Sequence, residues 1–247
     1  MANGKNEKKV NRRFLLTLFK ILSLKAIFTF VILAFFLSSC KKAVSTNPIK
    51  TNPAYNNVLI LGNSITYSPA NPGAGWNGSW GMAASAADSD FVHRLTVHFK
   101  SVNQSAVVTA VNIAAFERDF NNYDLVANLL TYKALKPDLI IVRIGENVTT
   151  TDSVGFDKRY TDLLNYFKAN NPNVKILAFG SVWLYRDLAN NVMAKHSDYV
   201  SLVSLASDLS NYAFGLFTDP GIQNHPCDKG MRAISDRIWQ AVEKSRN

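Results

Sequence analysis

Short apolar runs alternate with segments of helical periodicity along the chain after residue 56. Runs rich in β-branched and other apolar residues predict five strands. These strands are expected at residues 57–61, 106–113, 138–142, 174–179 and 199–205. The third run is apolar at nearly every position, which is typical of a strand that is covered on both faces.

Helical segments separate these runs. Phe91, Leu95 and Phe99 recur every four residues, a spacing that places apolar side chains on one face of a helix. Comparable patterns occur further along the chain. We predict helices at residues 91–99, 123–130, 156–169 and 229–244.

The alternation of strands and helices indicates an α/β domain. Parallel strands need crossover connections, which helices supply, so the pattern predicts a parallel sheet with helices on both faces. The expected architecture is a three-layer α/β/α sandwich around a five-stranded sheet in the flavodoxin-like order. In such folds the functional groups gather at the carboxyl ends of the strands.

The first 40 residues have the pattern of an export signal. Basic residues come first, and the uninterrupted apolar run extends only from residue 26 to residue 37, whereas a membrane-spanning helix needs about 20 residues. The run ends in Leu37-Ser38-Ser39-Cys40, which resembles the lipobox of bacterial lipoproteins. We expect a signal peptide at 1–40, lipidation of Cys40, and export to the cell envelope with a lipid anchor in the outer membrane or on the periplasmic face. An ordinary signal peptide, or an N-terminal anchor with an incidental cysteine, is the alternative.

This assignment changes the interpretation of the charge. The formal net charge is +9, but residues 1–40 hold seven Lys or Arg and one Glu. The basic character belongs mostly to the signal, so it does not indicate nucleic-acid binding. With Cys40 lipidated, Cys227 is the only other cysteine, and no disulfide can form within the mature chain.

Two regions follow the signal. Residues 41–56 are rich in Ser, Thr, Asn and Pro, which is typical of a solvated tether. Residues 57–247 are enough for one domain with a well-buried core. The sequence has no spacing typical of metal ligands and no phosphate-binding glycine motif, so we expect no cofactor.

A serine directly follows the first strand. Residues 58–61 are apolar, Gly62 and Asn63 end the run, and Ser64 comes next. A serine hydroxyl needs a base to become a nucleophile, and the oxyanion that it creates needs donors. Of the four histidines, His225 is the candidate base, because it lies in a loop directly before the last predicted helix and can return to the top of the sheet.

Three motifs resemble the SGNH/GDSL hydrolase family. Gly62-Asn63-Ser64 resembles its Gly-Asp-Ser block, with Asn in place of Asp. Gly145-Glu146-Asn147, after the third strand, resembles its Gly-x-Asn block, and His225-Pro226 resembles its last block. The resemblance spans most of residues 57–247 and implies the SGNH hydrolase fold.

The resemblance also implies a mechanism. Ser64 would attack an ester carbonyl, His225 would take and later return the proton, and water would release the acyl-enzyme. The Ser64 N–H and the Asn147 amide would hold the oxyanion.

The second block of the family normally adds a glycine N–H to the oxyanion hole. Residues 112–118 contain no glycine. A backbone N–H near Phe116 or Glu117 is the expected substitute, since such a donor does not require glycine.

The acid that orients the histidine is displaced as well. The family's Asp lies three residues before the histidine, where this chain has Ile222, and Asp219 is the nearest upstream candidate. Either Asp219 completes a triad, or Ser64 and His225 work as a dyad with a backbone carbonyl, as in some carbohydrate esterases of the family.

Arg143 lies inside the third predicted strand, where a charge is costly unless it is paired. Glu117, Asp119 and Glu146 are its possible partners. We favour a structural ion pair that braces the site over contact with substrate.

Tryptophans lie in loops on the expected side of the sheet. Trp76 and Trp80 follow the nucleophile in a glycine-rich loop, and Trp183 follows the fourth strand. Aromatic faces can stack on sugar rings, although tryptophans also commonly pack loops. We expect these three residues to contact substrate.

The expected partner is therefore an acylated carbohydrate, and the expected function is removal of O-acyl groups, above all acetyl groups, from a glycan. No long apolar lid segment is evident in the mature chain, which disfavours long-chain lipids. A lysophospholipase or thioesterase is the enzymatic alternative. A non-catalytic glycan-binding lipoprotein is the other, because the second-block glycine is missing and the acid is displaced.

Overall fold

The computed structural model describes residues 54–246. The predicted signal peptide, the lipobox cysteine and most of the predicted tether lie outside the described residues, as does Asn247. Within the described part of the chain, no helix has both the length and the apolar character that crossing a bilayer requires.

The last residues of the predicted tether contact the domain. The Tyr55 hydroxyl forms a hydrogen bond with Ser245 Oγ at 3.1 Å. The Asn56 N–H donates to Asp138 Oδ2 at 2.7 Å. These two residues therefore belong to the folded part of the chain.

A five-stranded parallel sheet forms the centre of the domain, as predicted. Its strands are β1 (Asn57–Gly62), β2 (Val107–Asn112), β3 (Leu139–Arg143), β4 (Lys175–Phe179) and β5 (Asp198–Val200). Their order across the sheet is β2-β1-β3-β4-β5, which confirms the flavodoxin-like order. β1 and β3 are neighbours, and Gly62 at the carboxyl end of β1 pairs with Arg143 at the end of β3.

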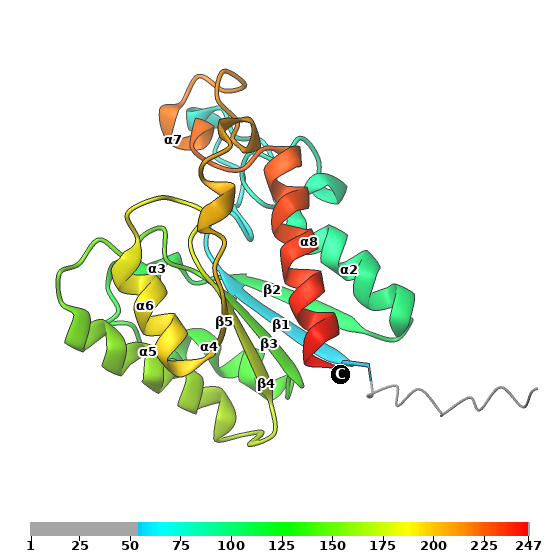
Figure 1. The fold of residues 1–247 in the computed structure, drawn as a ribbon, viewed down its shortest axis with the longest axis vertical. Helices are drawn as coiled ribbons and strands as arrows, with labels where there is room; N and C mark the ends of the chain where they lie inside the picture. Colours follow the sequence, from blue (N-terminus) through cyan, green and yellow to red (C-terminus); the bar gives the residue numbers. More distant parts are fainter. Residues whose placement is uncertain (1–53, 247) are drawn as a thin grey trace, which may run out of the picture. The chain divides into compact units, whose positions relative to one another are not determined.

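Helices cover both faces of this sheet (Figure 1). The helices are α2 (Phe91–Val102), α3 (Ala114–Arg118), α4 (Leu125–Ala134), α5 (Ser153–Lys168), α6 (Asp187–His196), α7 (Pro220–Gln223) and α8 (Asp228–Ser245). Single 3-10 turns occur at Pro72–Ala74, Ala87–Ser89, Val203–Leu205 and Leu209–Asn211. In Figure 1, α2 and α8 lie together on one face of the sheet and α3, α4, α5 and α6 on the other, so the predicted three-layer sandwich is confirmed.

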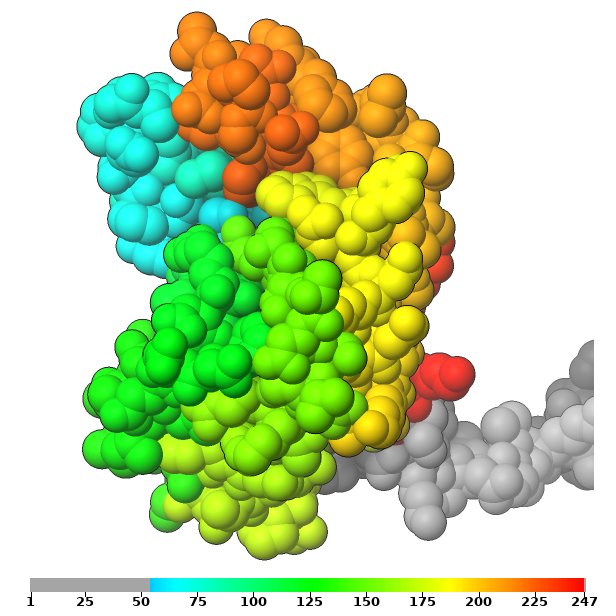
Figure 2. All heavy atoms as spheres, turned by 90° about the vertical axis from the view of Figure 1, so that its left-hand side faces the viewer, coloured from blue at the N-terminus to red at the C-terminus, as the bar shows by residue number. Residues whose placement is uncertain are grey.

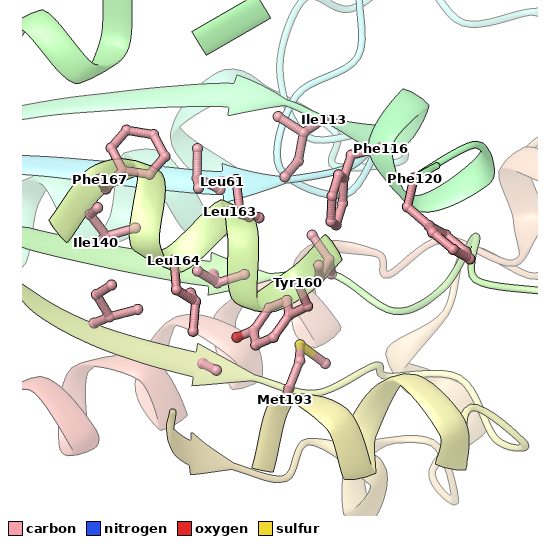
Figure 3. Packing of buried hydrophobic residues seen from close by; sticks show 14 of the residues in the cluster. Leu61, Ile113, Phe116, Phe120, Ile140, Tyr160, Leu163, Leu164, Phe167 and Met193 are labelled. Carbon is pink, nitrogen blue, oxygen red and sulfur yellow. The ribbon is translucent and has the colours of Figure 1, made fainter. Parts of the chain in front are cut away.

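The alternation of side chains along the strands divides the core into two clusters. Leu59 and Leu61 of β1 point toward the α5 face, whereas Val58 and Ile60 point toward the face covered by α2 and α8. Figure 3 shows members of the first cluster from the sheet and from α5, including Leu61, Ile140, Leu163, Leu164 and Phe167. Burial on both faces explains why the strands read as nearly continuous apolar runs.

The observed elements differ from the predicted ones at several boundaries; α4, for example, covers Leu125–Ala134 where a helix was expected at 123–130. β5 pairs with β4 over residues 198–200 only, because β4 ends at Phe179 and offers no partner beyond it. Residues 203–205, expected in the fifth strand, form a 3-10 turn. α5 begins at Ser153, before the predicted start, because the Asp152 side chain caps it.

Candidate active site

Ser64 lies in a tight turn at the carboxyl end of β1. The N–H groups of Thr66 and Tyr67 donate to the Asn63 carbonyl oxygen, at 2.9 and 3.0 Å. The turn requires glycine at position 62, since a Cβ there would lie 2.6 Å from Thr66 Cβ. The chain thereby presents the half-buried Ser64 side chain at the edge of the sheet.

His225 lies 161 residues after Ser64 in the chain but contacts it at the carboxyl end of the sheet. It lies between α7 and α8, and its Nε2 is 2.7 Å from Ser64 Oγ. His225 is 7% exposed, and its backbone N–H donates to the Ile222 carbonyl oxygen at 2.9 Å. The structure therefore brings together the two residues that the sequence analysis expected to act as nucleophile and base.

The second ring nitrogen of His225 contacts a backbone carbonyl. Nδ1 lies 2.8 Å from the Gly221 carbonyl oxygen. A carbonyl oxygen can only accept a hydrogen bond, so Nδ1 carries the proton in the neutral ring. Nε2 is then the free base that faces the Ser64 hydroxyl, which is the tautomer that general-base catalysis requires.

Asp219 does not take the place expected of the orienting acid. Its carboxylate caps α7 by accepting from the Ile222 N–H at 3.1 Å. Within residues 54–246 no hydrogen bond joins Asp219 to His225, and the Gly221 carbonyl oxygen occupies the position at Nδ1. Since Asp219 caps the turn that contains Gly221, the structure corresponds to the dyad alternative.

Asn147 follows β3 and is half-buried beside the end of β1. Its side-chain Nδ2 donates to Glu117 Oε2 at 2.8 Å, and its backbone N–H donates to Glu117 Oε1 at 3.3 Å. An amide nitrogen carries two hydrogens, so one remains for a substrate oxygen. The Asn147 side chain can therefore bind Glu117 and an oxyanion together.

The expectation that a backbone N–H at Phe116 or Glu117 completes the oxyanion hole is not supported. Both N–H groups donate to the Ile113 carbonyl oxygen, at 2.8 and 3.4 Å, because these residues form the short helix α3. The Glu117 carboxylate is instead the group that contacts the site. Glu117 is 1% exposed.

One backbone donor remains near the nucleophile. Within residues 54–246, the N–H of Ser64 makes no hydrogen bond to the protein. This N–H and the second Asn147 Nδ2 hydrogen are the groups that can stabilise an oxyanion.

Trp76 and Trp80 pack against each other, and the burial of Trp76 corrects the expectation that its ring contacts substrate, whereas Trp80 is half-buried. Trp76 is 3% exposed, and its Nε1 donates to the Ser68 carbonyl oxygen at 3.3 Å. The two rings meet edge to face with centroids 5.7 Å apart, and the Trp80 Nε1 donates to the Ala84 carbonyl oxygen at 2.9 Å. Trp76 therefore builds the interior of the loop and cannot offer its face to a sugar.

Trp183 remains beside the candidate catalytic residues. Its ring meets the His225 ring edge to face at 6.0 Å, and its Nε1 donates to the Asn224 carbonyl oxygen at 2.9 Å. The Arg186 guanidinium lies 5.7 Å from the Trp183 ring centroid. These contacts fix the ring next to the histidine.

Trp183 also lines a pocket of about 420 Å³. The pocket is mainly aromatic and apolar, and its lining consists of Trp183, Leu184, Arg186, Ala206, Leu209, Tyr212, Phe214 and Asn224. Figure 2 shows the surface hollowed between the cyan segment after β1, the orange segment around α7, and the yellow and green segments after β4 and β3. The loops at the carboxyl end of the sheet thus surround the candidate site.

Comparison with known proteins identifies the fold. No family model and no curated protein matches the chain. Among solved structures, a two-domain esterase active on acetylated mannans is 18% identical with a TM-score of 0.53, covering 77% of this chain and 50% of that chain. A family two carbohydrate esterase from Clostridium thermocellum, in complex with cellohexaose, is 15% identical with a TM-score of 0.51, covering 78% and 65%. A GDSL-like lipase from Bacteroides ovatus is 16% identical with a TM-score of 0.51, covering 78% and 100%.

These neighbours belong to the SGNH/GDSL hydrolases. The chain has the SGNH/GDSL hydrolase fold. It spans about half the length of the mannan esterase.

Two departures from the SGNH/GDSL pattern meet in one buried network. Asn63, which stands where the family has Asp, donates from Nδ2 to Glu146 Oε2 at 2.6 Å and to Glu117 Oε1 at 3.3 Å. Its Oδ1 accepts from the Ile65 N–H at 3.1 Å. An aspartate has no hydrogen to donate to the two glutamates when it is ionised, so the buried Glu117 carboxylate is compatible with asparagine at position 63 and not with aspartate. This pairing of substitutions is the signal in the sequence that could have revealed the role of the Glu117 side chain.

Arg143 finds its partner in Glu146, one of the three carboxylates considered from the sequence. Arg143 is fully buried, and its Nη1 donates to Glu146 Oε1 at 2.9 Å. The Val182 N–H donates to the same oxygen at 2.9 Å. This ion pair joins the end of β3 to the segment that follows it, which agrees with the structural role expected for Arg143.

Burial affects the titration of the SGNH/GDSL-like site. It lowers the pKa of His225 below the ordinary value of 6.5, because the charged imidazolium loses hydration. Burial and the neighbouring charge of Glu146 raise the pKa of Glu117, although hydrogen bonds from Asn147 and Gly145 act in the opposite direction. Within the described residues, no group of three or more His, Cys, Asp or Glu side chains is arranged to hold a metal ion.

The lowered pKa of His225 leads to a prediction for the pH dependence of any hydrolysis in which this ring acts as the general base. The base must be neutral, so kcat/KM falls as the pH drops through the pKa of the free enzyme. Because burial lowers this pKa, the midpoint of the acid limb is expected below pH 6.5. A pH–rate profile at constant ionic strength measures it, with thermal unfolding at each pH as the control. A midpoint above pH 6.5 would show that the folded site favours the charged ring.

Proposed function

We propose that the protein is a serine esterase that removes O-acetyl groups from a carbohydrate through an acyl-enzyme on Ser64. The observation that supports this proposal most directly is the 2.7 Å contact between Ser64 Oγ and His225 Nε2. The Gly221 carbonyl oxygen at Nδ1 keeps Nε2 unprotonated in the neutral ring. Nucleophile and base are thus arranged for proton transfer before substrate arrives.

The reaction takes place in two steps. Ser64 Oγ forms a bond to the acetyl carbonyl carbon and gives its proton to His225 Nε2, while the Ser64 N–H and Asn147 Nδ2 stabilise the oxyanion. The bond to the sugar oxygen then breaks, and His225 returns the proton to that oxygen. In the second step water gives a proton to His225 Nε2 and its oxygen bonds to the acyl carbon. The bond between that carbon and Ser64 Oγ then breaks, His225 returns the proton to Ser64 Oγ, and acetate leaves.

Trp183 and the adjoining pocket support a carbohydrate as the leaving group. An aromatic face beside the base can stack on a sugar ring, and the pocket is lined mainly by aromatic and apolar side chains. Two structures with the same fold are an esterase co-crystallised with mannopentaose and a carbohydrate esterase in complex with cellohexaose. Residues 41–247 show no long apolar lid segment, which favours a short acyl group.

Replacement of Trp183 by alanine tests the sugar contact. The KM for an acetylated oligosaccharide is expected to rise about tenfold, which corresponds to a loss of about 1.4 kcal/mol of binding. The kcat/KM for nitrophenyl acetate, which has no sugar, should change much less. Trp183→Phe keeps a flat ring and serves as the matched control. Equal losses on both substrates in Trp183→Ala would mean that the ring supports His225 and does not bind sugar.

A direct test of the proposed function combines labelling with turnover. A fluorophosphonate should form a covalent adduct that mass spectrometry locates on Ser64, and the adduct should be absent from Ser64→Ala. The wild type should hydrolyse nitrophenyl acetate and release acetate from acetylated mannan or xylan, and Ser64→Ala should do neither. Release of fatty acid from a lysophospholipid or a thioester instead of acetate would favour those classes. Binding of glycan without adduct or turnover would favour the non-catalytic glycan-binding alternative.

We also propose that Cys40 carries the lipid that holds this activity at the cell envelope, in the outer membrane or on the periplasmic face. The lipobox-like sequence before it supports the assignment. Metabolic labelling with a fatty acid should mark the wild type and spare Cys40→Ala. A labelled Cys40→Ala protein would overturn the assignment.

A further inference from the structure

We infer that the Glu117 carboxylate is a positioning residue that holds the Asn147 amide with its nitrogen directed toward the reacting carbonyl oxygen. The inference rests on the proposed esterase function and adds a residue to it. In this fold the second block normally contributes a glycine N–H. Here the block contributes a side chain that acts through Asn147.

Four hydrogen bonds converge on the Glu117 carboxylate. All four donors are N–H groups, and they come from the segments that follow β1 and β3. They are Gly145 N at 2.6 Å, Asn147 Nδ2 at 2.8 Å, Asn147 N at 3.3 Å and Asn63 Nδ2 at 3.3 Å. One buried carboxylate therefore ties the nucleophile turn to the loop that carries Asn147.

The chemistry of these contacts fixes the orientation of the amide. The four N–H donors favour the ionised form of Glu117 and oppose the burial that raises its pKa. An ionised carboxylate only accepts hydrogen bonds. If the Asn147 side chain turned over, its Oδ1 would face Glu117 Oε2 at a distance of 2.8 Å, and the two oxygens would repel each other. Nδ2 must therefore face Glu117, and its second hydrogen stays available at the site. A neutral side chain at position 117 would lose most of this preference.

The surroundings keep Glu117 in place although it is buried. Glu146 is the other carboxylate nearby, and the Arg143 guanidinium compensates its charge. The Asn63 amide separates the two glutamates by donating to both. The backbone N–H of Gly145, whose φ of +130° suits glycine, donates to Glu117 at 2.6 Å. These hydrogen bonds hold the Glu117 carboxylate in one position, and from that position it orients the Asn147 amide.

A double-mutant cycle distinguishes positioning from a general structural role. Asn147→Ala is expected to lower kcat by about 10²- to 10³-fold, the usual effect of losing one oxyanion donor. Glu117→Gln, which keeps size and shape, should lower kcat by about 10- to 100-fold with little change in KM, as supporting residues commonly do. If Glu117 acts through Asn147, the double variant should be no slower than Asn147→Ala alone. Losses that multiply would overturn the inference.

A second measurement covers the case in which Glu117→Gln folds poorly. In the wild type, one Asn147 side-chain N–H should exchange slowly with solvent and resonate downfield in ¹H–¹⁵N NMR spectra, with Asn147→Asp as the assignment control. Two Asn147 hydrogens that exchange equally fast would overturn the inference. If the wild type hydrolysed no ester at all, the proposed function would be wrong. That result differs from the results that contradict the role of Glu117, so the two outcomes can be distinguished.

Discussion

Replacing His225 with alanine is expected to lower kcat for ester hydrolysis by about 10⁴- to 10⁶-fold. His225 Nε2 lies 2.7 Å from Ser64 Oγ, and within the described residues no other side chain forms a hydrogen bond with that oxygen. Without the ring, the hydroxyl has no acceptor for its proton, and the leaving sugar oxygen has no donor. Initial rates on nitrophenyl acetate measure the effect, and circular dichroism together with thermal unfolding checks that the variant folds. A variant that kept even a tenth of the wild-type rate would exclude His225 as the base.

Asp219→Ala is the matched comparison, because it separates a triad from a dyad. If Asp219 oriented the histidine, its loss would cost about 10⁴-fold in kcat. The structure assigns the Nδ1 contact to the Gly221 carbonyl oxygen and gives Asp219 the cap of α7. We therefore expect about 1 kcal/mol of lost stability, as for other helix caps, and less than a tenfold loss in kcat. A loss near that of a triad aspartate would contradict the dyad.

The sheet could be predicted because its strands are buried on both faces. Residues 139–142 are fully buried and apolar, so they indicate a strand without any knowledge of their neighbours. The flavodoxin-like order was a reasonable expectation because it is one of the common strand orders of open α/β sheets. β5 shows the limit of this approach, since its length depends on where β4 ends and not on its own composition.

The candidate catalytic residues could be predicted from their places at the ends of strands and helices. Ser64 lies just after Asn63 at the end of β1, Asn147 follows β3, and His225 precedes α8, so the topology brings them to one edge of the sheet. The contacts that orient them depend on α3 and α7, which are too short to show a helical period. The Gly221 carbonyl oxygen and the Glu117 carboxylate were therefore beyond sequence reasoning, although Asn63 gave an indirect indication.

Asn63 explains why this site departs from the Gly-Asp-Ser pattern. Its amide donates to two buried carboxylates, and within residues 54–246 the buried cation Arg143 pairs with Glu146 alone. Glu117 in the second block would be unfavourable beside an aspartate in the first, because like charges without a donor between them repel in a buried site. The two substitutions are therefore expected to depend on each other.

Asn63→Asp, which restores the usual residue of the family, is accordingly expected to destabilise this protein. At pH 8 we expect a loss of about 3–5 kcal/mol in the free energy of unfolding, the range for an unpaired buried charge. Asn63 is fully buried, so water cannot compensate the new carboxylate. Asn173→Asp makes the same change at an exposed position, and it should alter stability by no more than about 0.5 kcal/mol.

The pH dependence of Asn63→Asp tests the cause of this loss. Burial and the carboxylates of Glu117 and Glu146 should raise the folded-state pKa of the new Asp above its ordinary value of about 3.9. A group whose pKa is raised on folding costs nothing below its unfolded pKa, and its full cost is present above its folded pKa. Urea unfolding between pH 5 and pH 8 should therefore show the difference from wild type growing as the pH rises, while Asn173→Asp follows the wild type. A difference that stays constant over this range would mean that lost packing or a lost donor, and not the added charge, destabilises the variant.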